Sequence, residues 1–191
     1  MKKLVMSILV FCVMCFGCIN SDAAEYGVYV EPNLVFDFSQ ANYLKESGSN
    51  SEFAGVTNFG GGVAIGYDFL TKFNVPVRVE AEYIIRTDAK FDYNDKSRTV
   101  HTPQTLFANA YLDFVNNTDF TPYMGGGVGA SIINADMNFA WNAGAGVAWN
   151  FAPDWDLDLG YRYVSFGDFE ADNADGIMSA HEIQLGLRYT F

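Results

Sequence analysis

Apolar and polar residues alternate along eight separate stretches of the chain. A period of two places successive side chains on opposite faces of a β-strand, so each stretch predicts a strand with two different surroundings. The alternation is weakest where GGGVG blurs it, in the fifth stretch. The stretches are 26–38, 57–69, 75–87, 105–114, 122–132, 139–151, 155–163 and 181–191.

The connections between these stretches alternate in length and composition. Short connections are rich in turn-forming residues, and most of the others are longer and polar. The short ones are 71–74, 116–119 and 152–154, and the others are 39–55, 88–103, 167–180 and a brief one at 133–138. This arrangement predicts an all-β fold, an eight-stranded antiparallel up-and-down barrel.

The two faces of these strands favour a membrane barrel over a soluble, lipocalin-like one. The polar face carries many glycines in 57–69, 122–132 and 139–151, where glycine is a poor strand residue without a packing reason. The apolar face carries tryptophan and tyrosine near the strand ends, as expected at membrane interfaces. Each stretch is long enough to cross the hydrocarbon layer as a tilted strand. We therefore expect a transmembrane β-barrel with a polar interior that side chains fill.

The N-terminus has the three parts of an export signal. Two lysines precede an apolar run, residues 4–19, and small residues follow, so we expect cleavage after Ala23 or Ala24. The chain then divides into a signal peptide, residues 1–23, and a transmembrane β-barrel domain, residues 24–191. The net charge of −12 disfavours nucleic acid as a partner, because phosphates need a basic surface.

All three cysteines, Cys12, Cys15 and Cys18, lie inside the predicted signal peptide. Their spacing matches a metal-ligand pattern, but an apolar signal core offers no polar groups to orient such ligands. Lipid attachment at Cys18 is an alternative to ordinary cleavage, since a small residue, Gly17, precedes it as in lipoprotein signals.

Residues 171–182, ADNADGIMSAHE, match four positions of an EF-hand calcium loop, including Asp175 and Glu182. Ala171 takes the first ligand position, however, and we expect Glu182 in a strand rather than a helix. The stretch is therefore interpreted as a solvated acidic loop, and we expect neither a metal nor a cofactor.

The polar face also carries charged residues of both signs. Ions inside a barrel need partners, and an eight-stranded barrel has just enough interior for side chains. We therefore predict a structural ion-pair network that plugs the lumen, with a narrow ion path as the alternative. Its predicted members are Arg78, Glu80, Glu82, Arg86, Asp158, Arg162, Glu182 and Arg188.

Catalysis is the main alternative from another functional class. The two histidines, His101 and His181, each lie near a predicted loop, and no nucleophile motif surrounds either of them. Ser179 and Glu182 are close to His181 in sequence, but neighbours on a strand point to opposite faces. We therefore expect no enzyme.

Three segments carry a resemblance to a known family. WNAGAGVAWNFAPDWDLDLGYRYVSFGDF (Trp141 to Phe169), TPYMGGGVGA (Thr121 to Ala130) and HEIQLGLRYTF (His181 to Phe191) resemble the opacity-protein and porin-like surface antigens, a superfamily of small outer-membrane barrels. The resemblance implies a Gram-negative-type outer membrane, with short turns in the periplasm and loops outside. It also implies that Phe191, with Tyr189, forms the signal that the barrel-assembly machinery recognises.

Members of this superfamily act as adhesins, immune-evasion factors or structural proteins, so the resemblance indicates location better than activity. We expect a monomeric surface protein, structural or adhesin-like, surrounded by outer-membrane lipids and lipopolysaccharide, whose loops contact a host or surface ligand. The alternatives are a small porin-like channel and a lipid A-modifying enzyme. Candidate loop contacts, expected to be exposed, are Tyr43, Phe53, Phe91, Tyr93, Phe166 and Phe169.

Overall fold

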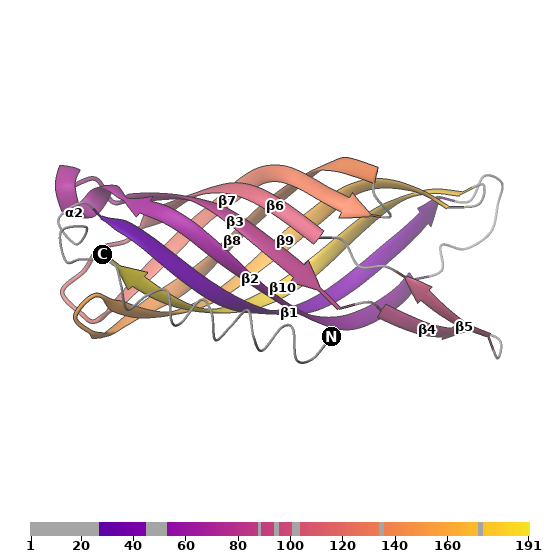
Figure 1. The fold of residues 1–191 in the computed structure, drawn as a ribbon, viewed down its shortest axis with the longest axis horizontal. Coiled ribbons are helices and arrows are strands. Elements are labelled where there is room, and N and C mark those ends of the chain that lie inside the picture. Colours follow the sequence, from indigo (N-terminus) through magenta and orange to yellow (C-terminus); the bar gives the residue numbers. More distant parts are fainter. Residues whose placement is uncertain are drawn as a thin grey trace.

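Eight antiparallel strands form a closed barrel, which confirms the predicted fold (Figure 1). The computed structural model describes residues 27–44, 53–87, 89–93, 96–100, 104–133, 136–171 and 174–191. Around the barrel the strand order is β1-β10-β9-β8-β7-β6-β3-β2, so β1 and β10 close it. The barrel strands are β1 (Val28–Leu44), β2 (Phe53–Asp68), β3 (Val77–Arg86), β6 (Gln104–Asp113), β7 (Phe120–Ile133), β8 (Asp136–Ala152), β9 (Trp155–Ala171) and β10 (Ala174–Thr190).

Two smaller elements lie at opposite ends of the barrel (Figure 1). β4 (Ala89–Tyr93) and β5 (Lys96–Val100) pair as a separate two-stranded sheet at the loop end. At the other end, the predicted turn at 71–74 is part of a one-turn helix, α2 (Phe69–Phe73). The Asp68 carboxylate accepts a hydrogen bond from the Leu70 backbone amide at 2.7 Å and so caps this helix. No helix among the described residues has the length and apolar character to cross a bilayer.

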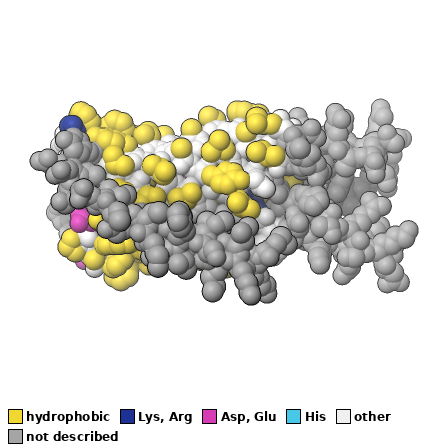
Figure 2. All heavy atoms as spheres, in the orientation of Figure 1, with side chains coloured by type: hydrophobic (Ala, Val, Ile, Leu, Met, Phe, Trp, Pro, Cys, Tyr) yellow, Lys and Arg dark blue, Asp and Glu magenta, His cyan; other side chains and the backbone are white. Residues whose placement is uncertain are grey.

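The alternating faces point as the sequence predicts. On β3, Arg78 and Glu82 are buried inside the barrel, whereas Val79 and Ile85 are exposed on the outside. Hydrophobic side chains are spread over the described part of the outer wall, and hardly any charged side chains lie among them (Figure 2). Such a wall, with polar groups inside and apolar groups outside, suits a barrel surrounded by lipid.

Aromatic and imidazole rings mark two levels on the outer wall. Neighbouring strands pair these rings directly, Trp155 with Tyr189 at one level and Tyr163 with His181 at the other. On each strand the two rings are eight residues apart, which corresponds to about 20 Å along the axis of a tilted barrel. The rings are Trp149 and Trp141 on β8, Trp155 and Tyr163 on β9, and Tyr189 and His181 on β10.

Two predicted loops are largely strand instead. The connection expected at 39–55 is shortened because β1 continues to Leu44 and β2 begins at Phe53. The connection expected at 167–180 is shortened in the same way, because β9 continues to Ala171 and pairs with Ala174 of β10. Polar residues on both faces remove the alternation signal there, although backbone pairing continues.

Candidate functional site

The lumen contains the densest set of polar contacts in the described part of the chain. Near the end of the barrel that carries α2, Arg78 forms a bidentate pair with Asp113, at 2.8 Å from Nε to Oδ2 and 3.0 Å from Nη2 to Oδ1. Arg188 lies at the same end, with Nε 3.2 Å from Asp156 Oδ2 and Nη1 3.7 Å from Asp158 Oδ2. These pairs neutralise buried charge at the α2 end of the lumen.

Tyrosines fill the space around these arginines. The Arg78 guanidinium lies 5.1 Å from the Tyr111 ring centroid and 5.0 Å from that of Tyr123, and the Tyr123 hydroxyl donates to Asp158. Tyr29 occupies its place because Gly66 has no side chain: a Cβ at position 66 would overlap the Tyr29 ring. The glycine on β2 therefore makes room for a tyrosine of β1, as packing inside a small barrel requires.

The middle of the lumen is organised around Arg162. Its Nη1 donates to Glu82 Oε2 at 2.6 Å, and its Nε donates to Glu182 Oε2 at 2.7 Å. The other oxygen of Glu82 accepts from Gln184 at 2.8 Å and from Asn33 at 3.0 Å. Residues of β1, β3, β9 and β10 are thus joined through one guanidinium and one carboxylate.

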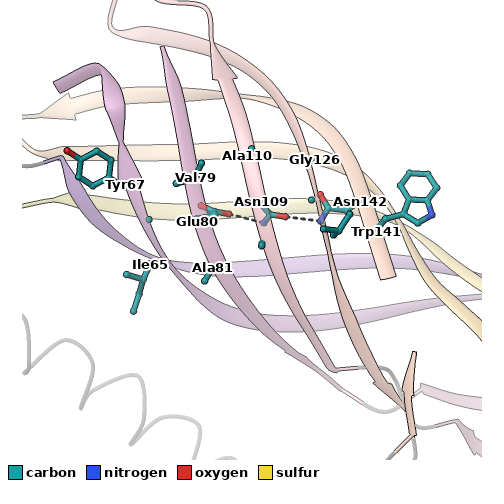
Figure 3. A pocket seen from close by; sticks show the side chains of 14 residues that line it. Ile65, Tyr67, Val79, Glu80, Ala81, Asn109, Ala110, Gly126, Trp141 and Asn142 are labelled. Atoms are coloured by element: carbon teal, nitrogen blue, oxygen red, sulfur yellow. Dashed lines mark hydrogen bonds between the residues drawn. The ribbon is translucent and has the colours of Figure 1, made fainter. Parts of the chain in front are cut away.

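Glu80 lies beside this centre but has different partners. Its carboxylate accepts from the hydroxyls of Tyr29 and Tyr111, each at 2.9 Å, and from Asn109 Nδ2 at 3.0 Å. Asn109 in turn accepts from Asn142 Nδ2 at 2.9 Å, which gives the row Glu80–Asn109–Asn142 (Figure 3). The described donors to Glu80 are therefore neutral groups.

Towards the loop end, Arg86 closes the network. Its Nε donates to Glu182 Oε1 at 2.9 Å and lies 3.2 Å from Asp37 Oδ2, and its Nη1 donates to Thr105 Oγ1 at 3.0 Å. The guanidinium stacks 5.0 Å from the Phe166 ring centroid. Phe166 belongs to a buried apolar layer, whose Phe107 ring lies 5.6 Å from the Arg162 guanidinium. The members of this layer are Phe107, Ala140, Val164, Phe166 and Ala180.

The structure places all eight predicted lumen residues inside the barrel, and all are buried. Three acids outside the predicted set complete the arginine pairs: Asp37, Asp113 and Asp156. Their signal was present, because each lies on the polar face of an alternating stretch. Which arginine each acid would meet depends on the relative register of strands distant in sequence, which the alternation does not give.

One predicted loop contact is wrong. Phe166 was expected to be exposed, but its side chain is fully buried in the apolar layer of the lumen. The side chains of the other candidates, Tyr43, Phe53, Phe91, Tyr93 and Phe169, lie outside the described residues, as do the signal peptide, Cys18 and His101.

Two other sequence motifs now have a structural setting. Glu182, the last position of the calcium-like stretch, is buried and bound by Arg86 and Arg162. No group of three or more potential metal ligands occurs among the described residues. His181 points outward, where its Nδ1 lies 2.7 Å from the Tyr161 hydroxyl and its ring contacts that of Tyr163.

Comparisons with known proteins agree with this architecture. The family model described as "Outer membrane protein beta-barrel domain" matches residues 8–191. Outer membrane protein PagN of Salmonella typhimurium is 32% identical over 176 residues, covering 70% of this chain and 73% of that protein. Opacity protein opA60 of Neisseria gonorrhoeae is 28% identical over 155 residues, covering 60% of this chain and 63% of that protein.

Solved structures show the same fold. The crystal structure of neisserial surface protein A (NspA) aligns with a TM-score of 0.58 at 20% identity, covering 86% of this chain and 97% of that one. Outer membrane protein OprG from Pseudomonas aeruginosa aligns with a TM-score of 0.56 at 13% identity, covering 87% of this chain and 97% of that one.

Proposed function

Since this chain belongs to the outer membrane protein β-barrel family, we propose that it is a non-conducting surface protein, adhesin-like or structural, whose loop end contacts a host or surface ligand. The protein is an integral barrel of the outer membrane. In the proposed orientation the end with α2 faces the periplasm, and the end with β4 and β5 faces outward.

The filled lumen is the observation that carries this proposal. Four arginines each meet a carboxylate inside the barrel: Arg78 and Arg188 near the α2 end, Arg162 in the middle and Arg86 towards the loop end. Two rings of the apolar layer pack against the arginines, Phe166 against Arg86 and Phe107 against Arg162. Desolvated and mutually paired charges do not provide a continuous aqueous path, so the arrangement supports a scaffold rather than a channel.

The loop end of the barrel offers a larger surface for contacts than the α2 end. β3 ends at Arg86, which is level with Val35 of β1 through Gly60 of β2. From Val35, β1 continues for nine residues to Leu44, roughly 30 Å of strand. Paired strands that extend beyond the lipid, together with the β4–β5 hairpin, are suited to present side chains to another surface.

The surroundings of His181 on the outer wall favour a binding or structural role over a lipid-modifying enzyme. Within the described part of the chain, His181 contacts Tyr161 and Tyr163 and forms no ion pair with a carboxylate. A hydrolytic triad needs an acid to orient the histidine and a hydroxyl to be activated by it. We therefore propose that the barrel has no catalytic role.

Two measurements test the proposal. Planar bilayers with the purified barrel should show no discrete current steps, and regular conductance steps would contradict the closed lumen.

Bacteria that display the barrel should bind cultured epithelial cells several-fold better than bacteria lacking it. Replacing residues 89–100 by a short Gly-Ser linker should remove most of this gain, while the same replacement at the short connection 116–119 should not. Equal binding by bacteria with and without the barrel would exclude the adhesin-like role.

A further inference from the structure

A shallow apolar hollow of about 930 Å³ crosses the outside of the barrel wall, from β2 to β8 (Figure 3). Two adjacent rows of paired residues line it, and they run across the strands rather than along them. One row is Tyr67, Val79, Ala110 and Gly126, and the other is Ile65, Ala81, Ala108, Val128 and Trp141.

The order of residue sizes along these rows creates the hollow. Large side chains are at the ends, Tyr67 on β2 and Trp141 on β8, and small residues such as Ala108 and Ala110 lie between them. At Gly126 a Cβ would approach the Asn142 carbonyl oxygen to 2.5 Å, so the backbones of β7 and β8 leave no room for a side chain there. The hollow is therefore fixed by backbone geometry as well as by the alanines.

The surroundings identify hydrocarbon as the occupant. The lining side chains Ile65, Val79 and Val128 are exposed on the outward face, which is continuous with the lipid-facing wall. The polar row Glu80–Asn109–Asn142 lies directly behind them, on the lumen side of the same strands. An apolar occupant of the hollow therefore adds to the apolar layer between this row and the surrounding lipid. Separation of such polar groups from hydrocarbon is favourable because polar atoms near lipid are costly.

The length of the hollow suits a single acyl chain. From β2 to β8 there are four strand-to-strand steps, about 19 Å in total. One leaflet contributes about 15 Å of the bilayer's hydrocarbon thickness. An extended chain of one leaflet that starts at Tyr67 therefore fits inside the hollow and ends before Trp141, which belongs to the ring level nearer the loops.

The Tyr67 end leads to a suitable place for a phosphate. The Tyr67 ring lies 4.8 Å from that of Phe69 and 6.5 Å from that of Phe73, both in α2. Lys72 Nζ lies 6.0 Å from the Phe73 ring centroid. Aromatic rings with a lysine are typical of the membrane interface, where a lysine attracts lipid phosphates. The four arginines with described side chains all point into the lumen, so Lys72 supplies the positive charge on the outside at this end.

We propose that this hollow binds one glycerophospholipid of the periplasmic leaflet, with an acyl chain between the two rows and the phosphate near Lys72. The proposal rests on the membrane placement of the barrel and on the orientation that puts α2 in the periplasm. It does not depend on what the loops bind.

Native mass spectrometry of the full mature barrel tests this site after reconstitution with phosphatidylethanolamine and phosphatidylglycerol and transfer to detergent. The unmodified barrel should retain one phospholipid. Ala110→Leu should lower retention at least fivefold, because it fills the middle of the hollow, and Lys72→Gln should lower it about threefold. Ala145→Leu is the matched control. Ala145, on β8, is exposed and points outward as Ala110 on β6 does, but it lies outside the hollow. This substitution should leave retention unchanged.

Several outcomes would overturn the assignment. The first two are absence of retained phospholipid and equal retention by the Ala110→Leu and Ala145→Leu barrels. A third is preferential retention of lipid A when both lipids are supplied. A fourth is a barrel dimer that Ala110→Leu converts to a monomer, because a second barrel would then be the occupant. Retention unchanged by Lys72→Gln would overturn the placement of the phosphate. Heat-modifiable migration verifies folding of each variant, and Ala108→Leu replaces Ala110→Leu if the latter does not fold.

Discussion

Arg162 and Glu182 are directly paired positions on β9 and β10, and their side chains also meet, with Arg162 Nε 2.7 Å from Glu182 Oε2. The second oxygen of Glu182 is bound by Arg86, which comes from β3 on another part of the barrel wall. One buried carboxylate thus connects three strands, of which β3 is a neighbour of neither β9 nor β10. Such a contact braces the barrel across its lumen in addition to the hydrogen bonds around its circumference.

The first prediction concerns removal of Arg162. Arg162→Ala leaves Glu82 and Glu182 each short of a charged partner in a buried setting, and breaking a buried pair in this way typically costs about 3–5 kcal/mol. We therefore expect a lower temperature for loss of the compact, heat-modifiable band and a lower free energy of unfolding in urea.

A double-mutant cycle distinguishes coupling from loss of bulk. If the network acts as a unit, adding Glu182→Gln to Arg162→Ala should cost much less than Glu182→Gln costs alone. Additive losses would mean that the two residues stabilise the barrel independently.

The second prediction compares two neighbouring acids. Glu80 accepts hydrogen bonds from two hydroxyls and an amide, whereas Glu82 accepts from Arg162. A glutamine can accept from or donate to the neutral groups, so Glu80→Gln should change the free energy of unfolding by about 1 kcal/mol or less. Glu82→Gln should cost several times more because it leaves Arg162 with less compensation. Urea unfolding of both variants in one detergent checks this, and the reverse order would refute the assigned partners.

The third prediction concerns the contact between Gly66 and Tyr29. Gly66→Ala places a Cβ within the Tyr29 ring, which must move and lose its 2.9 Å hydrogen bond to Glu80. Overpacking of this kind typically costs about 1–3 kcal/mol, so the midpoint of urea unfolding should fall. Tyr29→Leu should recover part of this loss when combined with Gly66→Ala. A double variant no better than Gly66→Ala alone would show that the ring is not the cause.

The sequence predicted the barrel because lipid and lumen impose opposite requirements on alternate residues. That constraint placed Arg78 and Glu182 inside without knowledge of their partners. It could not show that Arg86 meets Glu182, because the two are 96 positions apart and their contact depends on barrel closure and strand stagger.

The error at Phe166 has a simple physical origin. Phe166 has the same parity as Asp158 and Arg162, so continuing the alternation of β9 would have placed it inside. The polar residues that follow suggested a loop and ended the predicted strand at Tyr163. In the structure β9 continues, and a register shift opposite Met178 and Ser179 comes only at Phe166, before Gly167 with φ +86°. Lipid imposes the alternation of apolar and polar residues only on membrane-spanning segments, so the alternation does not show where strands end outside the membrane.

The last prediction concerns Phe191. Its backbone amide donates to the Val28 carbonyl at 2.8 Å, where β10 meets β1, and its ring packs edge-on against Tyr189 at 4.9 Å. Phe191→Ser keeps the backbone hydrogen bond, so barrels that do assemble should retain nearly normal heat resistance. If the terminal aromatic is an assembly signal, the same substitution should lower the amount of folded barrel in isolated outer membranes several-fold. Phe151→Ser is the control, because Phe151 is an exposed aromatic next to Trp149 at the same end of the barrel. Equal losses from both substitutions would indicate that Phe191 acts as a lipid-facing anchor rather than as a signal.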